Sequence, residues 1–157
     1  IQGTCFTAGI ELMLNSDVVI VSDNSNFAQM EVQLGIMPFG GATVRFVAAA
    51  GWQKSMPYLL TGKNFDAHTA DKLGIVSEVV PNGEEYERAL TIAKEISNAA
   101  PLGVKGLISS AQDATRNGAG VALGNIHSYL PALFHSEDAK EGAMAMVERR
   151  AAEFKGR

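Results

Sequence analysis

The pattern of hydrophobic residues along this chain of 157 residues changes at Pro81. Before Pro81, apolar runs of strand length alternate with short stretches of helical periodicity, and turn-forming residues separate them. After Pro81 only helical periodicity is found. We therefore predict an α/β region over residues 1–81 and a helical region over residues 82–157, without internal repeats.

The elements expected in the first region are short. In chain order they are a turn over residues 3–9, a helix over 10–14, a strand over 18–21, a strand or ordered loop over 27–33, helices over 42–50, 52–60 and 67–73, and a strand over 75–80. Pro57 must lie at the start of its helix or kink it. Asp66 and Gly74 flank residues 67–73 as an N-cap and a C-cap.

The second region carries helical periodicity to its end. We expect helices over residues 86–96, 101–114, 121–134 and 137–154. On the last of these a narrow apolar seam recurs at spacings of three, four and three, made of Met144, Val147, Ala151 and Phe154. Periodicity does not distinguish a seam that packs on its own chain from one that packs on a second copy.

Composition narrows the function classes. The formal net charge of −4 gives no electrostatic footprint for nucleic acid, and no apolar stretch has the length of a membrane span. Cys5 is the one cysteine and cannot form an internal disulfide, which favours a reducing, cytoplasmic location. Clustered His and Cys patterns of a metal site are missing. We expect neither nucleic acid, membrane nor metal as a partner.

Two glutamates and a glycine pair stand out, each with more than one interpretation. Glu11 falls in the first turn of a helix, where a carboxylate is usually an exposed charge that complements the dipole. Glu31 lies in an apolar run, where a single carboxylate is usually an ion-pair partner. Gly40 and Gly41 precede a helix, so they could cradle a phosphate or pack against the preceding loop.

Several segments, taken in order, resemble the enoyl-CoA hydratase/isomerase (crotonase) family over essentially the whole chain. They are residues 3–12, 26–32, 34–35, 38–42, 60–62, 73–76 and 80–81, with Ala67, Ala70, Asp138, Glu141, Gly142, 148–150 and Phe154. Four residues depart from the common pattern. Thr7 and Ala8 replace glycines, Met30 replaces a frequent proline, and Phe39 is bulky where small residues are usual.

The resemblance implies a fold and an assembly. The fold is a fragment of the crotonase-like β-α spiral (the ClpP/crotonase type), with the core over residues 1–81 and a helical trimerisation region over 82–157. It also implies a homo-oligomer, trimeric or hexameric. A second oxyanion donor and the main adenine-binding loop would lie upstream of Ile1, so that the chain is the C-terminal portion of an enzyme and is inactive alone.

The resemblance further implies an enoyl-CoA hydratase of fatty acid metabolism, which adds water syn to a trans-2-enoyl-CoA and gives a 3-hydroxyacyl-CoA. Glu11 and Glu31 fall on the paired catalytic glutamates, and Ala8 on an oxyanion N–H donor. The residues expected to contact the acyl-CoA are Ala8, Gly9, Phe39 and Gly40. No cofactor is implied, because coenzyme A arrives within the substrate. The alternatives are a double-bond isomerase of the same family and an inert oligomerisation module.

The chemistry has a physical basis of its own. Adding water to a conjugated thioester needs a base, a proton donor and stabilisation of the charge that develops on the carbonyl oxygen. Two carboxyl groups that face one water can divide the acid and base tasks. Ala8 and Glu11 lie three residues apart and share one helical face, so a short segment can present a donor and a carboxylate together.

Overall fold

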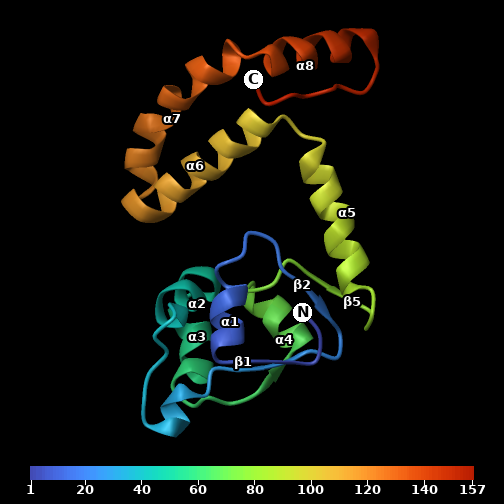
Figure 1. The fold of residues 1–157 in the computed structure, drawn as a ribbon. Coiled ribbons are helices and arrows are strands. Elements are labelled where there is room, and N and C mark those ends of the chain that lie inside the picture. Colours follow the sequence, from blue (N-terminus) through green and yellow to red (C-terminus); the bar gives the residue numbers. More distant parts are fainter. The chain divides into compact units, whose positions relative to one another are not determined.

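The structure is a computed structural model that describes residues 1–157, and the chain divides into two compact units, Ile1–Thr91 and Ile92–Arg157 (Figure 1). The predicted change of pattern, after Pro81, precedes this division, which falls within the helix Glu85–Ser97. The first unit contains β1 (Thr4–Phe6), α1 (Ala8–Met13), β2 (Ile20–Ser22), β3 (Asn26–Ala28), the 3-10 helix η1 (Glu31–Leu34), α2 (Ala42–Ala50), α3 (Trp52–Leu59), β4 (Phe65–Asp66), α4 (Ala67–Leu73) and β5 (Glu78–Val80). Then follow α5 (Glu85–Ser97), α6 (Pro101–Asn117), α7 (Ala119–Phe134) and α8 (Glu137–Glu148).

Two small sheets organise the first unit. In one of them β1 lies parallel to β3, with Cys5 opposite Phe27, and β4 adds antiparallel to β3. In the other, β2 lies parallel to β5. Because β1 and β3 run side by side in one direction, the helices that follow them, α1 and η1, begin at the same edge of the sheet.

Aromatic packing supplies the centre of the first unit's core. The Phe65 ring stacks on Phe27 with 5.4 Å between centroids and meets Phe46 and Tyr58 edge-on at 6.1 and 4.7 Å. Phe27 and Phe46 are fully buried. These contacts tie β3, β4, α2 and α3 together, and an aromatic pair contributes about 0.5–1.5 kcal/mol beyond the burial of its area.

The second unit contains mainly helices and little core. In it, α6 packs along α7, and Leu133 lies 3.4 Å from where a Cβ on Gly106 would stand. Gly118, with a φ of 85°, makes the turn between the two helices. The buried apolar residues of this unit are Ala122 and Ala145. No helix of the chain combines the length and the hydropathy that a membrane crossing requires.

Predictions that rested on local signals hold. The mixed α/β class and the helices over 42–50 and 67–73 are confirmed at those bounds. The Asp66 side chain accepts from the N–H of Thr69 at 2.8 Å, and Gly74 ends the helix with a φ of 72°. Pro57 lies inside α3.

Predictions that ignored distant partners fail. The predicted turn over residues 3–9 is wrong for Thr4–Phe6, which becomes β1 because β3 supplies its hydrogen-bonding partner. The strand or ordered loop predicted over residues 27–33 divides into the end of β3 (Asn26–Ala28) and the 3-10 helix η1, which begins at Glu31. The strand over 75–80 shortens to β5, Glu78–Val80.

The apolar seam along residues 137–154 is also wrong. Helix α8 ends at Glu148, because Arg149 adopts the left-handed conformation with a φ of 56°. The tail then folds back along the helix, and the Phe154 ring lies 3.5 Å from where a Cβ on Gly142 would stand. Ala151 and Phe154 therefore share no helical face with Met144.

Candidate active site

A sharp bend at Thr7 joins β1 to α1 and positions the start of the site. Thr7 adopts φ 50° and ψ −115°, its N–H donates to the carbonyl of Ala28 at 2.9 Å, and its carbonyl accepts from the N–H of Glu11 at 3.2 Å. Helix α1 then begins at Ala8. The first N–H groups of a helix have no acceptor inside it, so the N–H of Ala8 is available to a ligand.

Glu11 is buried, which excludes the exposed-charge interpretation. Its side chain is 8% exposed, and its Oε1 accepts from the N–H of Gly40 at 2.7 Å and of Ala42 at 3.1 Å. Gly40 lies on the loop before α2, and Ala42 is the first residue of that helix. The N–H groups of Gly40 and Ala42 thus bind the Glu11 carboxylate.

Gly40 has no room for a side chain. A Cβ added there would overlap Oε2 of Glu11 and would lie 2.7 Å from its Cδ. The next residue, Gly41, has a φ of 107°, a backbone conformation that residues with a side chain rarely adopt. The two glycines therefore allow the backbone to approach the Glu11 carboxylate closely.

Glu31 is buried as well, and it has no cationic partner. Its side chain is 5% exposed, and the Nε2 of the fully buried Gln29 donates to its Oε1 at 2.9 Å. Its Oε2 is buried and accepts no hydrogen bond from the chain. None of the four ion pairs in the chain includes Glu31, so the ion-pair interpretation is wrong.

The topology brings the two glutamates to one edge of a sheet. Glu11 lies on α1 and Glu31 on η1, and these helices follow the neighbouring parallel strands β1 and β3. The bond from Thr7 to Ala28 joins the two strands where they end. The two helices that follow neighbouring parallel strands thus each carry a buried carboxylate without a cation partner, and two such carboxylates are suited to dividing proton transfers at one reacting group.

Two of the other predicted contact residues, Phe39 and Gly9, lie in different surroundings. Phe39 is 85% exposed and precedes Gly40 directly, so it lies on the loop that holds Glu11. Gly9 lies instead against Cys5, whose sulfur is 3.1 Å from where a Cβ on Gly9 would stand. The sequence analysis did not identify Gln29 as a site residue. The available signal was a glutamine two residues before Glu31 in an otherwise apolar run.

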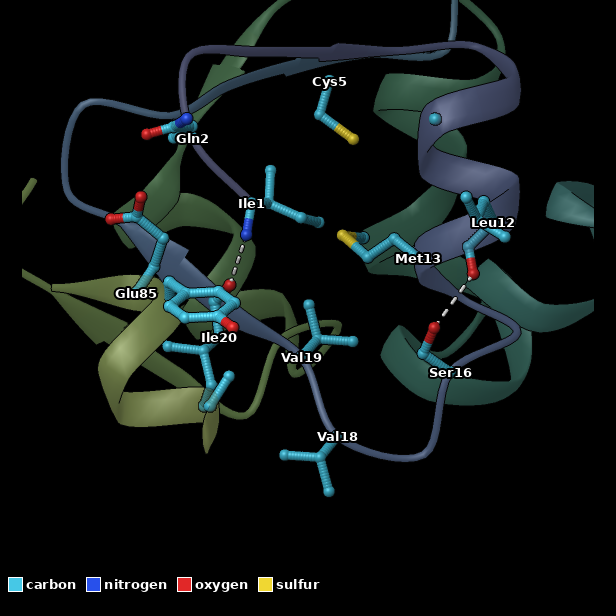
Figure 2. A pocket seen from close by; sticks show the side chains of 13 residues that line it. Ile1, Gln2, Cys5, Leu12, Met13, Ser16, Val18, Val19, Ile20 and Glu85 are labelled. Carbon is cyan, nitrogen blue, oxygen red and sulfur yellow. Dashed lines mark hydrogen bonds between the residues drawn. The ribbon is translucent and has the colours of Figure 1, made fainter. Parts of the chain in front are cut away.

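A cavity of about 560 Å³ lies beside α1 (Figure 2). Glu85 lines it, but Glu11 and Glu31 do not. Its wall is mainly apolar, with Ile1, Met13 and Val19 among the lining residues, and the amino group of Ile1 donates to the carbonyl of Ile20 at 2.8 Å. Cys5 also lines it, and burial raises the pKa of the Cys5 thiol. Glu11 and Glu31 thus lie outside this cavity, whereas Gly9, one of the predicted contact residues, lines it. No group of three His, Cys, Asp or Glu side chains is placed to hold a metal ion.

Comparison with known proteins defines the class. The model of the enoyl-CoA hydratase/isomerase family matches residues 1–157, so the chain belongs to that family. It is 36% identical over 161 residues to a carnitinyl-CoA dehydratase of Proteus mirabilis, covering all of this chain and 62% of the relative. It is 31% identical over 157 residues to a 2,3-dehydroadipyl-CoA hydratase of Escherichia coli, covering all of the chain and 62% of that protein.

Solved structures agree on the fold. A probable enoyl-CoA hydratase/isomerase from Mycobacterium abscessus superposes with a TM-score of 0.97 at 46% identity, covering 99% of this chain and 61% of that one. The crotonase-like fold predicted from the resemblance is thereby confirmed. The chain spans about 62% of the length of the curated relatives it matches.

Proposed function

We propose that the protein to which this chain belongs adds water to trans-2-enoyl-CoA thioesters and catalyses the reverse dehydration. One observation carries the proposal. Two buried glutamates without cation partners follow neighbouring parallel strands, and each has its Oε1 held by neutral N–H donors. Each carboxylate therefore keeps a second oxygen that can take or give a proton.

The proposed reaction divides the work between these groups. One carboxylate takes a proton from water as the oxygen bonds to C3 of the thioester, and the other glutamate, protonated, gives its proton to C2. The N–H of Ala8 stabilises the charge that develops on the thioester oxygen, and losing one such donor typically costs about 2.7–4 kcal/mol in the barrier. Hydration and dehydration use the same groups in opposite order, and the names of the relatives include both.

The proposed substrate contacts extend from Ala8 to the loop before α2. Phe39 is exposed beside Gly40, where its ring is free to meet an acyl chain. Gly9 and Gly40 complete the set by resemblance to the family. Coenzyme A enters and leaves as part of the thioester, so the proposed reaction needs no separate cofactor.

A double-bond isomerase is the second candidate. It would move one proton between two carbons of the acyl chain without adding water, a task for which a single carboxylate can suffice. Glu11 and Glu31 are held in different ways, one by backbone N–H groups and the other by a side-chain amide. Two separately held carboxylates favour hydration over isomerisation.

We also propose that the protein forms a homo-oligomer, trimeric or hexameric, through its helical region. The second unit exposes large apolar side chains, among them Leu107, Leu123 and Val147 at 70%, 67% and 83%. Exposed apolar surface of this kind marks association sites. If association through the helical region were the protein's only function, the chain would be an inert assembly module.

Turnover of crotonyl-CoA by the full-length protein tests the function. The expected result is loss of the conjugated thioester absorbance with formation of 3-hydroxybutyryl-CoA. Conversion of a 3-enoyl-CoA into the 2-enoyl isomer, with no hydroxyacyl product from either, would favour the isomerase. The 157-residue chain, assayed in parallel, should be inactive while remaining folded, and absence of turnover from both proteins would favour the assembly module.

A further inference from the structure

We propose that Gln29 is a positioning residue for Glu31, which fixes one carboxylate oxygen so that the other, Oε2, is the one that exchanges protons. This inference rests on the proposed hydration. The observations behind it are the 2.9 Å hydrogen bond from Gln29 Nε2 to Glu31 Oε1 and the unpaired, buried Oε2 of the same carboxylate.

The chemistry of the pair fixes the direction of this bond. The NH₂ group of Gln29 donates to Oε1 of Glu31, which can accept this bond whether or not Oε2 carries a proton. A neutral amide orients the carboxylate without forming an ion pair with it. A lysine or arginine in this place would hold the same oxygen but would bring a full charge into a buried site.

Glu11 shows the same division between its two oxygens. Both of its hydrogen bonds, from the N–H groups of Gly40 and Ala42, go to Oε1, and Oε2 points toward the space where Gly40 lacks a Cβ. The backbone holds Glu11, whereas a single side chain holds Glu31. Glu31 is therefore the catalytic candidate whose orientation one substitution can release.

Packing alone does not explain an amide in this place. Gln29 is fully buried, and its Oε1 accepts no hydrogen bond from the chain. A buried polar atom without a partner lowers stability, so an apolar side chain of similar length would fill the position at less cost if filling were its task. The amide is instead directed at a carboxylate of the candidate site.

Steady-state kinetics of the full-length protein with crotonyl-CoA tests the role. Gln29→Met keeps the length of the side chain and removes the donor. We expect kcat to fall by about 10-fold or more with KM within about twofold, because misplacement by about 1 Å costs on the order of 100-fold in rate while substrate binding persists. Gln29→Asn, which keeps an amide but is too short to reach Glu31, should lose a similar factor and serves if Gln29→Met folds poorly.

Two comparisons separate positioning from a structural role. In a Glu31→Gln background, Gln29→Met should lower kcat no further, because the two residues act through one group. Gln33→Met is the matched control, since Gln33 lies on the same segment but donates to the carbonyl of Thr61 at 2.8 Å. This control should keep parental kcat and KM.

Three results would overturn the inference while leaving the proposed function in place. They are parental kcat in both Gln29 variants, a rise in KM at constant kcat, and an equal loss of kcat with and without the Glu31→Gln substitution. Parental turnover in Glu31→Gln itself would instead overturn the proposed function, and the positioning role with it.

Discussion

The two units of the chain differ in what they bury. The first buries a core of aromatic and aliphatic side chains together with two glutamates and a glutamine at the candidate site. In the second, the buried apolar residues are two alanines, while many of its large apolar side chains are exposed: Ile96, Leu107, Val121, Leu123, Ile126, Phe134, Met144, Met146 and Val147. The first unit thus contains its own core and the candidate site, whereas the second buries little apolar surface of its own.

The largest effect is expected at the glutamates of the first unit. Glu11→Gln and Glu31→Gln, made in the full-length protein, should each lower the rate of crotonyl-CoA hydration by about 10²–10⁴-fold, because general acid and base groups typically contribute that much. Glu85→Gln is the matched control. Glu85 is also buried and also accepts a backbone N–H, from Gly83 at 2.9 Å, but it lies outside the candidate site. Parental turnover in either of the first two variants would remove that residue from the mechanism.

Replacing one phenylalanine in each unit by alanine compares how much a phenylalanine side chain of each unit contributes to the free energy of unfolding. Phe46→Ala should lower the free energy of unfolding by about 3–5 kcal/mol, because Phe46 is fully buried and packs on Phe65. In the dissociated monomer, Phe134→Ala should change it by no more than about 0.5 kcal/mol, because that residue is 70% exposed in the single chain. Denaturant unfolding of both variants provides the comparison, and equal losses would mean that Phe134 is covered in solution.

Charges placed on the exposed face of α8 test the proposed assembly. Met144→Asp and Val147→Asp should weaken self-association, because these side chains are 55% and 83% exposed and a charge there would be costly to bury at an interface. Sedimentation velocity across a dilution series is the measurement. Thr115→Asp, an added charge on an exposed position of α6, is the control. A parental protein that remains a monomer at micromolar concentration would contradict the proposal.

Thr7→Gly should stabilise the first unit. Thr7 adopts a φ of 50° with a ψ of −115°, a conformation that residues with a Cβ rarely hold and that typically costs about 1–3 kcal/mol. Glycine adopts it without that strain, and the hydrogen bond from its N–H to Ala28 would remain. A rise in the denaturant midpoint is expected, whereas a clear fall would show that the Thr7 side chain contributes contacts worth more than the strain.

The smallest effect is expected in the tail of the second unit. The Arg150 guanidinium and the N–H of Glu153 lower the pKa of Glu141 from its ordinary value of 4.5 to about 2. A lowered pKa in the folded state means that the stabilisation is present above 4.5 and is lost as the pH falls toward 2. The stability difference between the parent and Glu141→Gln should thus be small near neutral pH, because these groups are exposed, and should vanish near pH 2. A difference that persists there would contradict the assignment.

The sequence predicted what depends on neighbours along the chain. The helix from Ala67 to Leu73 was predicted at its true bounds because Asp66 and Gly74 cap it locally. The end of α8 was not, because it depends on contacts such as that of Asp138, which accepts from the N–H groups of Lys155 and Gly156 at 2.7 and 2.8 Å.

The same distinction applies to the candidate site. The resemblance pointed to Glu11, Glu31 and Ala8, and the structure shows both glutamates buried and α1 beginning at Ala8. The sequence did not reveal that Gly40 holds Glu11, because this contact joins residues 29 positions apart. Nor did it reveal the amide of Gln29 at Glu31, because the direction of a buried side chain follows from the fold around it.

The most direct test of the two-glutamate account is the stereochemistry of hydration in deuterated water. Two carboxylates at one edge of a sheet should deliver the hydroxyl and the proton to the same face of the double bond. Crotonyl-CoA turned over by the full-length protein in D₂O should give 3-hydroxybutyryl-CoA with a single deuterium at C2, on the face that received the hydroxyl, as measured by NMR of the product. Deuterium on the opposite face, or divided between both faces, would contradict the assignment of Glu11 and Glu31 as a cooperating pair.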